Sequence, residues 1–315
     1  AASARVLYKM SIPTGIIHDD TFHYTRRGEK EVPLEIETTF TLRAGSRRLE
    51  CVTRFENRAR NHRLRVFFPT YLIGAKESAA EAPFDVVRRP IERSPKHPYS
   101  QTANPQYPCL RFADISDGSI GLAIITEGIH EYEATDDRSR ALALTLLRSF
   151  EVTLCTVSYR WERRPDQILS HQLGAHEMRY AIYFHKGDWA DGRVMQEAEH
   201  FSLPLIPTQS GSLDKPPAPD AALPLASKGF LEINPDALVL SAFKRAEDSD
   251  DLILRLYNPT KRLLKGNVRF FRPVKKALMT NMNEEPQKGG AIKMTGNRIH
   301  FDAPAKKIIT IKLVL

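Results

Sequence analysis

Five acidic residues near the middle of the chain are the first candidates for chemistry. They are Glu127, Glu131, Glu133, Asp136 and Asp137. Two carboxylates held roughly 5–10 Å apart can act as acid and base in glycoside hydrolysis. The spacing of these residues fixes no such distance, and acids in a polar turn are usually only solvated. Glu131 is therefore kept as a weak candidate for an acid.

Three histidines, His171, His176 and His185, lie within fifteen residues and could be read as metal ligands. A protein metal site needs three or four ligands that converge. No H-E-x-x-H, H-x-H or H-x-D pattern joins these residues, so we predict no metal site from them. His185 follows an apolar run and is kept as a weak candidate for proton transfer, with a structural histidine as the alternative.

An arginine stands where an apolar run stops, at Leu147-Arg148-Ser149. An arginine in that place must pair with an acid or extend its guanidinium to water. One interpretation is a salt bridge at the end of a strand. The other is that the strand end, with Arg148 and Leu147, projects into a cleft shared with another domain.

Other motifs are less informative. The chain has no G-x-S-x-G, Walker A or G-x-G-x-x-G pattern, and residues 117–121 predict a hairpin turn. Aromatic side chains could form a surface for sugar stacking or belong to the core, the second being the better interpretation. These are Tyr159, Trp161, Tyr180, Tyr183 and Trp189.

The elements that would position these residues are predicted to be strands. The runs 120–126 and 141–147 predict two buried strands of one antiparallel sheet. Residues 33–57 alternate apolar and polar side chains around Ala44-Gly45-Ser46, which predicts a β-hairpin with one buried face. Residues 64–71 are expected to continue that hairpin as a third strand, and Cys51 to be buried.

Further along, the pattern is less regular. Residues 75–108 contain six prolines and are interpreted as a long surface excursion rather than strands. Residues 155–172 are expected to be irregular, residues 178–184 to form a strand, and residues 189–201 a short helix.

A proline-rich segment divides the chain. Residues 207–227 contain five prolines and are predicted to be a linker. About eight short runs with turn residues between them follow, which predicts a small β-sandwich. The predicted division is a β domain at 1–206, the linker at 207–227 and a sandwich at 228–315.

Composition narrows the class of protein. The 315 residues carry a net charge of +8, and basic residues gather at 261–276, where they alternate with strand-forming residues as on a solvated sheet face. No nucleic-acid motif accompanies them, so we predict no nucleic-acid partner.

No apolar run is long enough to cross a membrane. Three unpaired cysteines favour a reducing compartment, with the cytoplasm as the default. The absence of a starting methionine suggests a piece of a longer polypeptide.

Several segments, taken in order, carry a resemblance to a known family. They are RAGSRRLECVTRFENRARNHRLRVFFPT (43–70), PFDVVRRPIE (83–92), RFADISDGSIGLAIITEGIHEYE (111–133), ALALTLLRSF (141–150), HQLGAHEMRYAIYFHKGDW (171–189), HFSLPLIPTQ (200–209) and LSAFKRAEDSDDLILRLYNPT (240–260). This order resembles the C-terminal β region of a bacterial-type glycoside hydrolase family 38 α-mannosidase.

The resemblance implies an all-β chain: a galactose-mutarotase-like supersandwich, truncated at its N-terminal side, followed by a small β-sandwich. It also implies a parent enzyme that hydrolyses α-mannosides with retention, with a zinc ion and an aspartate nucleophile in an N-terminal catalytic domain. No catalytic residue, metal ligand or cofactor is then expected in this chain. The resemblance further implies that Arg148 ends a strand whose backbone approaches the sugar, although eukaryotic members have Asp-Arg-Arg where this chain has Leu147-Arg148-Ser149.

The sequence therefore predicts a non-catalytic portion of an α-mannosidase that borders the active site of a partner domain. The expected partners are that N-terminal domain and an α-mannoside or oligosaccharide, and a homo-oligomer is left open. One alternative is a carbohydrate-binding or interaction module without catalysis. A further alternative, mutarotase-like activity, would use His185 and Glu131.

Overall fold

The computed structural model describes residues 1–18, 25–92, 104–155, 160–163, 166–207, 229–287, 289 and 291–314. The chain forms two compact units. The first contains residues 1–82 and 87–202, and the second contains residues 83–86 and 203–315. Most of the predicted linker, residues 208–227, lies outside the described residues, so the predicted division 1–206, 207–227 and 228–315 stays a prediction.

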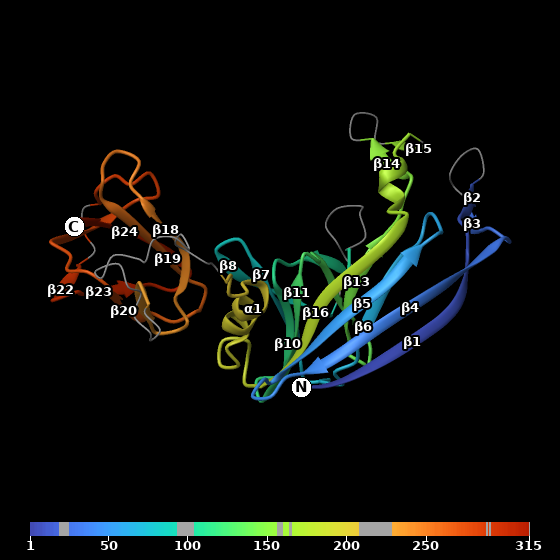
Figure 1. The fold of residues 1–315 in the computed structure, drawn as a ribbon, viewed down its shortest axis with the longest axis horizontal. Coiled ribbons are helices and arrows are strands. Elements are labelled where there is room, and N and C mark those ends of the chain that lie inside the picture. Colours follow the sequence, from blue (N-terminus) through green and yellow to red (C-terminus); the bar gives the residue numbers. More distant parts are fainter. Residues whose placement is uncertain are drawn as a thin grey trace, which may run out of the picture. The chain divides into compact units, whose positions relative to one another are not determined.

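The first unit is built on an eight-stranded sheet, called the large sheet, in the order β1-β4-β5-β16-β11-β10-β7-β8 (Figure 1). Its strands are β1 (Ala2–Pro13), β4 (Glu31–Leu42), β5 (Arg48–Asn57), β16 (Gly174–Lys186), β11 (Ile120–Glu127), β10 (Phe112–Ser116), β7 (Glu77–Ala82) and β8 (Asp85–Pro90). The predicted hairpin of residues 33–57 is confirmed as β4 and β5, with Phe40 opposite Cys51. Cys51 is buried, as predicted.

A second sheet of four strands, called the small sheet, has the order β6-β13-β12-β9. Its strands are β6 (Arg63–Phe68), β13 (Leu142–Arg148), β12 (Glu131–Ala134) and β9 (Gln106–Pro108). Side chains of both sheets share one core, in which Leu34, Ile124, Tyr132 and Leu144 are buried. We call the face of the large sheet that carries Leu34 and Ile36 its inner face. Two sheets around one core confirm the predicted β-supersandwich.

Two predictions about strand pairing are wrong. Residues 64–71 do not continue the hairpin, because β5 pairs with β16 instead and β6 pairs with β13 in the small sheet. The runs 120–126 and 141–147 are buried strands as predicted, but β11 belongs to the large sheet and β13 to the small one. Alternation along a strand shows which face is buried, and it does not identify the neighbour.

The proline-rich stretch is also more ordered than predicted. Residues 75–108 include β7, β8 and β9, and residues 78–81 are buried. Pro83 falls in the turn after β7, and Pro90 ends β8 at the edge of the large sheet. Proline has no backbone N–H, and neither position requires a donor to the hydrogen-bond ladder, so these prolines are compatible with the strands. The prolines at 95 and 98 lie outside the described residues.

Three further elements complete the first unit. A two-stranded hairpin of β14 (Val152–Cys155) and β15 (Arg160–Arg163), followed by the 3-10 helix η1 (Ile168–His171), replaces the predicted irregular stretch 155–172. The predicted strand 178–184 is confirmed within the longer β16, and the predicted helix 189–201 is the shorter α1 (Val194–Ser202). Strands β2 (Ile16–His18) and β3 (Thr25–Arg27) form a small hairpin.

The second unit confirms the small β-sandwich, whose described residues form eight strands in two sheets of four. One sheet has the order β17-β20-β23-β22 and the other β18-β19-β24-β21. Their bounds are β17 (Leu231–Asn234), β18 (Val239–Arg245), β19 (Leu252–Asn258), β20 (Leu264–Phe270), β21 (Lys276–Thr280), β22 (Lys293–Thr295), β23 (Arg298–Ala303) and β24 (Lys307–Val314). Leu254, Phe270, Ile299 and Ile311 form the centre of its core.

Within the described residues, no helix is both long and apolar enough to span a membrane.

Candidate functional site

The strand end that the sequence singled out is well defined in the structure. Leu147 is buried, and the side chain of Arg148 is 67% exposed at the last position of β13. The pairing of β13 with β6 shifts register between Thr145 and Leu147. A bulge of this kind bends a strand and changes the direction of the side chains that follow it. Leu147 therefore anchors the strand end in the core, while Arg148 faces solvent.

Glu131, another predicted candidate, lies beside Arg148. We call Arg63, Glu131, Thr145 and Arg148 the Glu131 cluster. The carboxylate of Glu131 accepts hydrogen bonds from Arg63 Nη2 at 2.5 Å and Thr145 Oγ1 at 2.7 Å. Arg148 Nη1 lies 3.5 Å from Glu131 Oε2. Three strands, β6, β12 and β13, thus bring one acid and two guanidinium groups to the end of the small sheet.

The electrostatics of Glu131 favour a permanent carboxylate. Burial alone would raise the pKa of this group, but the Thr145 hydroxyl and the Arg63 and Arg148 guanidiniums outweigh burial, so the pKa of Glu131 is lowered. A general acid at neutral pH needs a raised pKa. Glu131 is therefore suited to orienting Arg148 rather than to donating a proton.

The other acids of the predicted group are also engaged in pairs or turns. Glu127 pairs with Arg179, Glu133 with Arg65, and Asp136 with Arg140. Asp137 accepts a hydrogen bond from the backbone amide of Ser139 in a turn.

A set of polar residues, most of them buried, fixes the segment next to this strand end. Asn57, at the end of β5, donates from Nδ2 to the carbonyls of His171 and Gln172 at 2.9 and 3.0 Å. Its Oδ1 accepts from the amide of Ala59 and lies 2.8 Å from His62 Nε2. Asn57 thereby joins the turn that leads into β6 to the helix η1.

Ser149 connects this set to β13. The hydroxyl of Ser149 accepts a hydrogen bond from the amide of Asn61 at 3.0 Å and lies 3.4 Å from His171 Nδ1. We call Asn57, His62, Ser149 and His171 the Asn57 cluster. Burial and nearby arginines lower the pKa of both His62 and His171, so both imidazoles are neutral at neutral pH. The residue next to Arg148 is therefore fixed by a neutral hydrogen-bond network.

His185 lies elsewhere, near the end of β16 in the first unit. Its Nε2 is 2.7 Å from Asp114 Oδ2, and both side chains are buried. Burial lowers the pKa of His185, but the hydrogen bond with Asp114 and its charge outweigh burial and raise the pKa. The side chain of His185 contacts Asp114 and the backbone of Lys186, whereas Glu131 contacts Arg63, Thr145 and Arg148. No contact among the described residues joins the two residues of the mutarotase-like alternative.

Two glycines enclose the His185 ring. A Cβ atom on Gly121 would lie 2.3 Å from His185 Cε1, and one on Gly192 would lie 2.4 Å from His185 Nδ1. Contacts this short do not occur between real atoms, so both positions exclude a side chain. The imidazole is held in one place by packing as well as by Asp114.

The aromatic candidates belong to the core where their side chains are described. Tyr180, Tyr183 and Trp189 are buried, and none offers an open ring face for a sugar. His176 stacks on Phe55 with ring centroids 5.1 Å apart. Tyr159 and the side chain of Trp161 lie outside the described residues.

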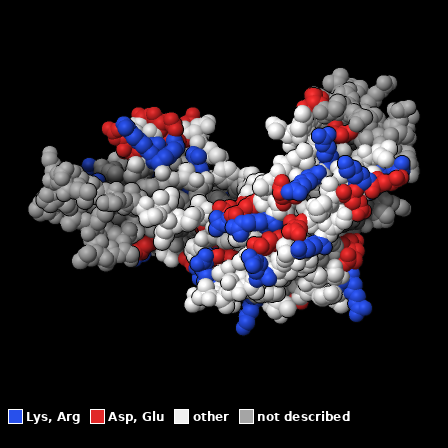
Figure 2. Space-filling view, turned by 45° about the vertical axis from the view of Figure 1, so that its right-hand side comes forward, with Lys and Arg blue, Asp and Glu red and all other residues white. Residues whose placement is uncertain are grey.

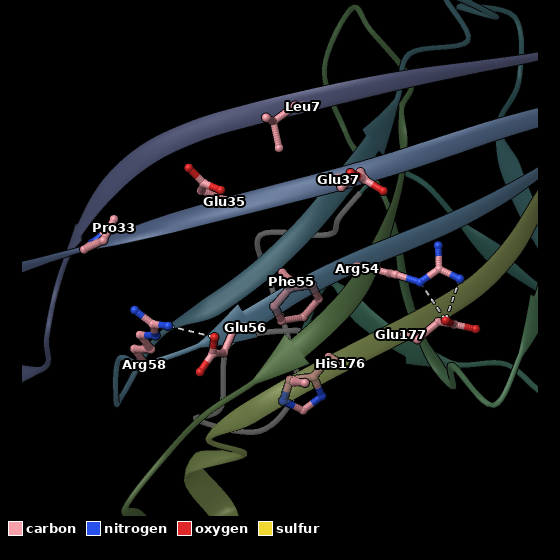
Figure 3. Close-up of a pocket in the computed structure, with 11 residues that line it drawn as sticks. Leu7, Pro33, Glu35, Glu37, Arg54, Phe55, Glu56, Arg58, His176 and Glu177 are labelled. Atoms are coloured by element: carbon pink, nitrogen blue, oxygen red, sulfur yellow. Dashed lines mark hydrogen bonds and ion pairs between the residues drawn. The ribbon is translucent and has the colours of Figure 1, made fainter.

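A groove of about 780 Å³ runs over the outer face of β1, β4, β5 and β16 (Figure 3). Its charged lining is mostly paired: Arg54 Nη2 lies 2.7 Å from Glu177, and Arg58 Nη2 lies 2.8 Å from Glu56. Figure 3 shows the two pairs at separate places, Arg54–Glu177 bridging β5 and β16 and Arg58–Glu56 at the end of β5, so the pairs do not converge on one point. The groove therefore resembles a solvated sheet face more than a reaction site.

The charged side chains on the surface form no large patch of one sign on the face shown in Figure 2. On the face shown in Figure 2, lysines and arginines are interspersed with aspartates and glutamates. In the second unit, Lys265 and Arg269 on β20 are exposed, while Val268 and Phe270 of the same strand are buried. Within β20, the basic residues of the run 261–276 thus lie on a solvated sheet face, as predicted.

The described side chains offer no set of ligands for a metal ion. Among the residues that the structure describes, no group of three or more His, Cys, Asp or Glu side chains converges as a metal ion would require. These residues do not fit the zinc site that the sequence resemblance implies for the parent enzyme. We assign no step through zinc to them.

Two family profiles match the chain, one in each unit. The glycosyl hydrolases family 38 C-terminal domain matches residues 15–152, and the family 38 C-terminal beta sandwich domain matches residues 237–312. The chain belongs to the C-terminal region of glycosyl hydrolase family 38. The predicted family is confirmed.

Family 38 relatives agree with this assignment. The chain is 28% identical over 235 residues to a Halalkalibacterium halodurans protein named "Putative mannosylglycerate hydrolase", covering 74% of this chain and 24% of that protein. It is 28% identical over 208 residues to human Alpha-mannosidase 2C1, covering 65% of this chain and 18% of that protein. The chain thus spans at most about a quarter of the length of these relatives.

Solved family 38 structures share the fold. An alpha-mannosidase from Enterococcus faecalis V583 superposes with a TM-score of 0.79 at 20% identity, covering 98% of this chain and 33% of that one. Another Enterococcus faecalis family 38 structure gives a TM-score of 0.76 at 20% identity, covering 98% of this chain and 34% of that one.

Sequence reasoning missed the Asn57 cluster and the partner of His185. The partner of His185 could have been found from the sequence. Asp114 interrupts the apolar run at 112–115, and a charged side chain on a buried strand needs a partner. For Asn57 no such signal exists, because the two carbonyls to which it donates belong to His171 and Gln172, more than a hundred residues further along the chain.

Proposed function

We propose that this chain is the C-terminal β portion of a retaining, zinc-dependent α-mannosidase and that it is not catalytic by itself. The observation that carries the proposal is the pair of family 38 C-terminal matches, one in each unit. One relative is named a putative mannosylglycerate hydrolase and another an alpha-mannosidase, so both names refer to the hydrolysis of mannosides. The nucleophile, the acid and the zinc ligands would belong to an N-terminal catalytic domain outside this chain.

The role we propose for the chain is to border the active site with the end of β13. Arg148 is exposed, carries a permanent charge and is oriented by Glu131 3.5 Å away. A guanidinium presents several donors in a fixed plane, which suits the hydroxyl groups of a sugar. The bulge and the Asn57 cluster hold the backbone that carries it. The free, buried thiols of Cys51 and Cys109 support a cytoplasmic location.

The first test is activity of the chain alone. The purified 315-residue chain, supplied with zinc, is expected to hydrolyse neither an aryl α-mannoside nor mannosylglycerate. Activity is expected to appear only with the catalytic domain encoded in the same gene. Zinc-dependent turnover by the chain alone would sink the proposal, as would a full-length protein that hydrolyses neither substrate.

The second test concerns Arg148. In the full-length enzyme, Arg148→Ala is expected to lower kcat/KM about tenfold, which corresponds to ~1.4 kcal/mol of transition-state stabilisation. Its melting temperature should hardly change, because exposed ion pairs contribute only about 0–1 kcal/mol. Arg54→Ala is the matched control, since Arg54 is also exposed and paired with a glutamate. A loss of less than twofold in Arg148→Ala, equal to that of the control, would contradict a role for this side chain.

A further inference from the structure

The inner face of the large sheet is incompletely covered at one end. Val6, Tyr8 and Met10 of β1 lie opposite Thr38, Ile36 and Leu34 of β4 in register, so all six side chains point to the same face. The three residues of β4 are buried in the core. Those of β1 are 36%, 57% and 43% exposed.

The reason is that the small sheet ends too early. Its outermost strand, β6, lies over β16, where the rings of Phe68 and Tyr180 are 5.9 Å apart. Within the described part of the chain, β6 pairs with β13 on one side and has no strand on the other. Leu64, Val66 and Phe68 on β6 are only partly buried. The shared core is therefore open to water between β6 and β1.

Single exposed apolar residues are normal on a protein surface, but this set is different. The exposed side chains continue the core along one face of two neighbouring strands, and Leu42 at the end of β4 adds to them at 46% exposure. They adjoin the edge of β6 that pairs with no strand in the described part of the chain. Natural proteins usually cover or charge such an edge.

Charge distinguishes the two faces of β1. On its outer face, Arg5 and Lys9 pair with Glu37 and Glu35, and the inner face carries no charged side chain between residues 4 and 10. An occupant of the inner face must therefore be apolar where it meets Val6, Tyr8 and Met10. It must also offer a strand edge to β6.

We propose that a β-strand from the rest of the family 38 polypeptide adds to the free edge of β6 and covers Val6, Tyr8 and Met10. This occupant is favoured over a second copy because the relatives are long: the chain spans 24% and 18% of two of them, so most of each lies outside the matched region. The docking strand would have apolar residues at alternate positions. The inference rests on membership of family 38 and not on the activity proposed above.

The test compares Tyr8→Lys with Leu7→Lys, in the 315-residue chain and in the full-length protein from the same gene. Tyr8 and Leu7 are adjacent on β1, 57% and 49% exposed, and on opposite faces. In the 315-residue chain, neither change is expected to shift the melting temperature measurably. In the full-length protein, Tyr8→Lys should lower it by about 5 °C or more, while Leu7→Lys leaves it unchanged.

Hydrogen–deuterium exchange gives a second, independent readout. The alternate amides of β6 that do not pair with β13 should exchange at least tenfold more slowly in the full-length protein than in the 315-residue chain. Equal exchange rates, or equal effects of the two lysine variants, would overturn the proposal. So would a gene that encodes no further polypeptide, or a dimer of the 315-residue chain that Tyr8→Lys dissociates.

These readouts do not depend on catalysis. A full-length protein that protects β6 but hydrolyses no mannoside would refute the proposed activity and keep the docking strand. An active enzyme in which the amides of β6 are not protected would support the proposed activity and refute the docking strand.

Discussion

Asp114→Ala is expected to lower the free energy of unfolding of the first unit by about 3 kcal/mol, because removing one member of a buried ion pair leaves the other without compensation. Asp114 Oδ2 and His185 Nε2 are 2.7 Å apart, and both side chains are almost fully buried. The ring has no other place to go, since Gly121 and Gly192 pack against it from two sides. Urea or thermal unfolding at pH 6 measures the loss.

The stability that the Asp114–His185 pair contributes is expected to fall as the pH rises. The pKa of His185 is raised in the folded chain, so the stability from its charged form is fully present below the unfolded pKa of about 6.5. That stability is lost as the pH rises through the folded pKa. The difference between wild type and Asp114→Ala should therefore be larger at pH 6 than at pH 9.

Two comparisons isolate the pair. Glu177→Ala removes an acid of an exposed pair in the same unit and should cost less than about 1 kcal/mol at both pH values. The double variant Asp114→Ala/His185→Ala should be less destabilised than the sum of the two single variants. Additive effects of the two single changes would show that the pair contributes nothing to stability.

Asn57→Ala is expected to have the second large effect, a loss of about 3 kcal/mol. The substitution removes two donated hydrogen bonds to the carbonyls of His171 and Gln172 and two accepted at Oδ1. Each typical hydrogen bond contributes about 1 kcal/mol, and a buried group left unsatisfied costs more. Asn104→Ala is the control, because Asn104 is exposed and accepts one hydrogen bond from the amide of Gln106.

The same substitution tests whether the Asn57 cluster positions the active-site border. Asn57 touches neither Arg148 nor the Glu131 cluster, and it acts through His171 and Ser149. If the strand end borders the sugar, Asn57→Ala in the full-length enzyme should raise KM several-fold at a temperature where the variant is fully folded. An unchanged KM with reduced stability would leave Asn57 a purely structural residue.

The sequence was most informative where a pattern repeats. Alternation predicted β4 and β5 with their buried face, and short apolar runs with turn residues predicted the strands of the second unit. Such patterns report which side of a strand meets the core, and this is decided locally by the period of the backbone.

Pairing and chemistry at the candidate site depend on distant segments. The neighbour of β5 is β16 and not β6, and nothing within residues 33–71 distinguishes these outcomes. Arg148 could be recognised as a strand end, but its ion pair with Glu131 depends on β12 lying beside β13. The sequence leaves the role of His185 open because its partner, Asp114, comes from a strand 71 residues earlier in the chain.

The central position of β16 has a consequence for synthesis of the protein. β16 pairs with β5 on one side and β11 on the other, and Asn57 meets Gly174 only after every other strand of the large sheet has been made. At roughly 5–20 residues per second, the ribosome needs on the order of ten seconds to make the intervening chain. During that interval the early hairpin exposes one unpaired edge and its apolar face. Folding of the first unit is thus timed by the arrival of its last strand, and chaperone binding in those seconds would act on β4 and β5.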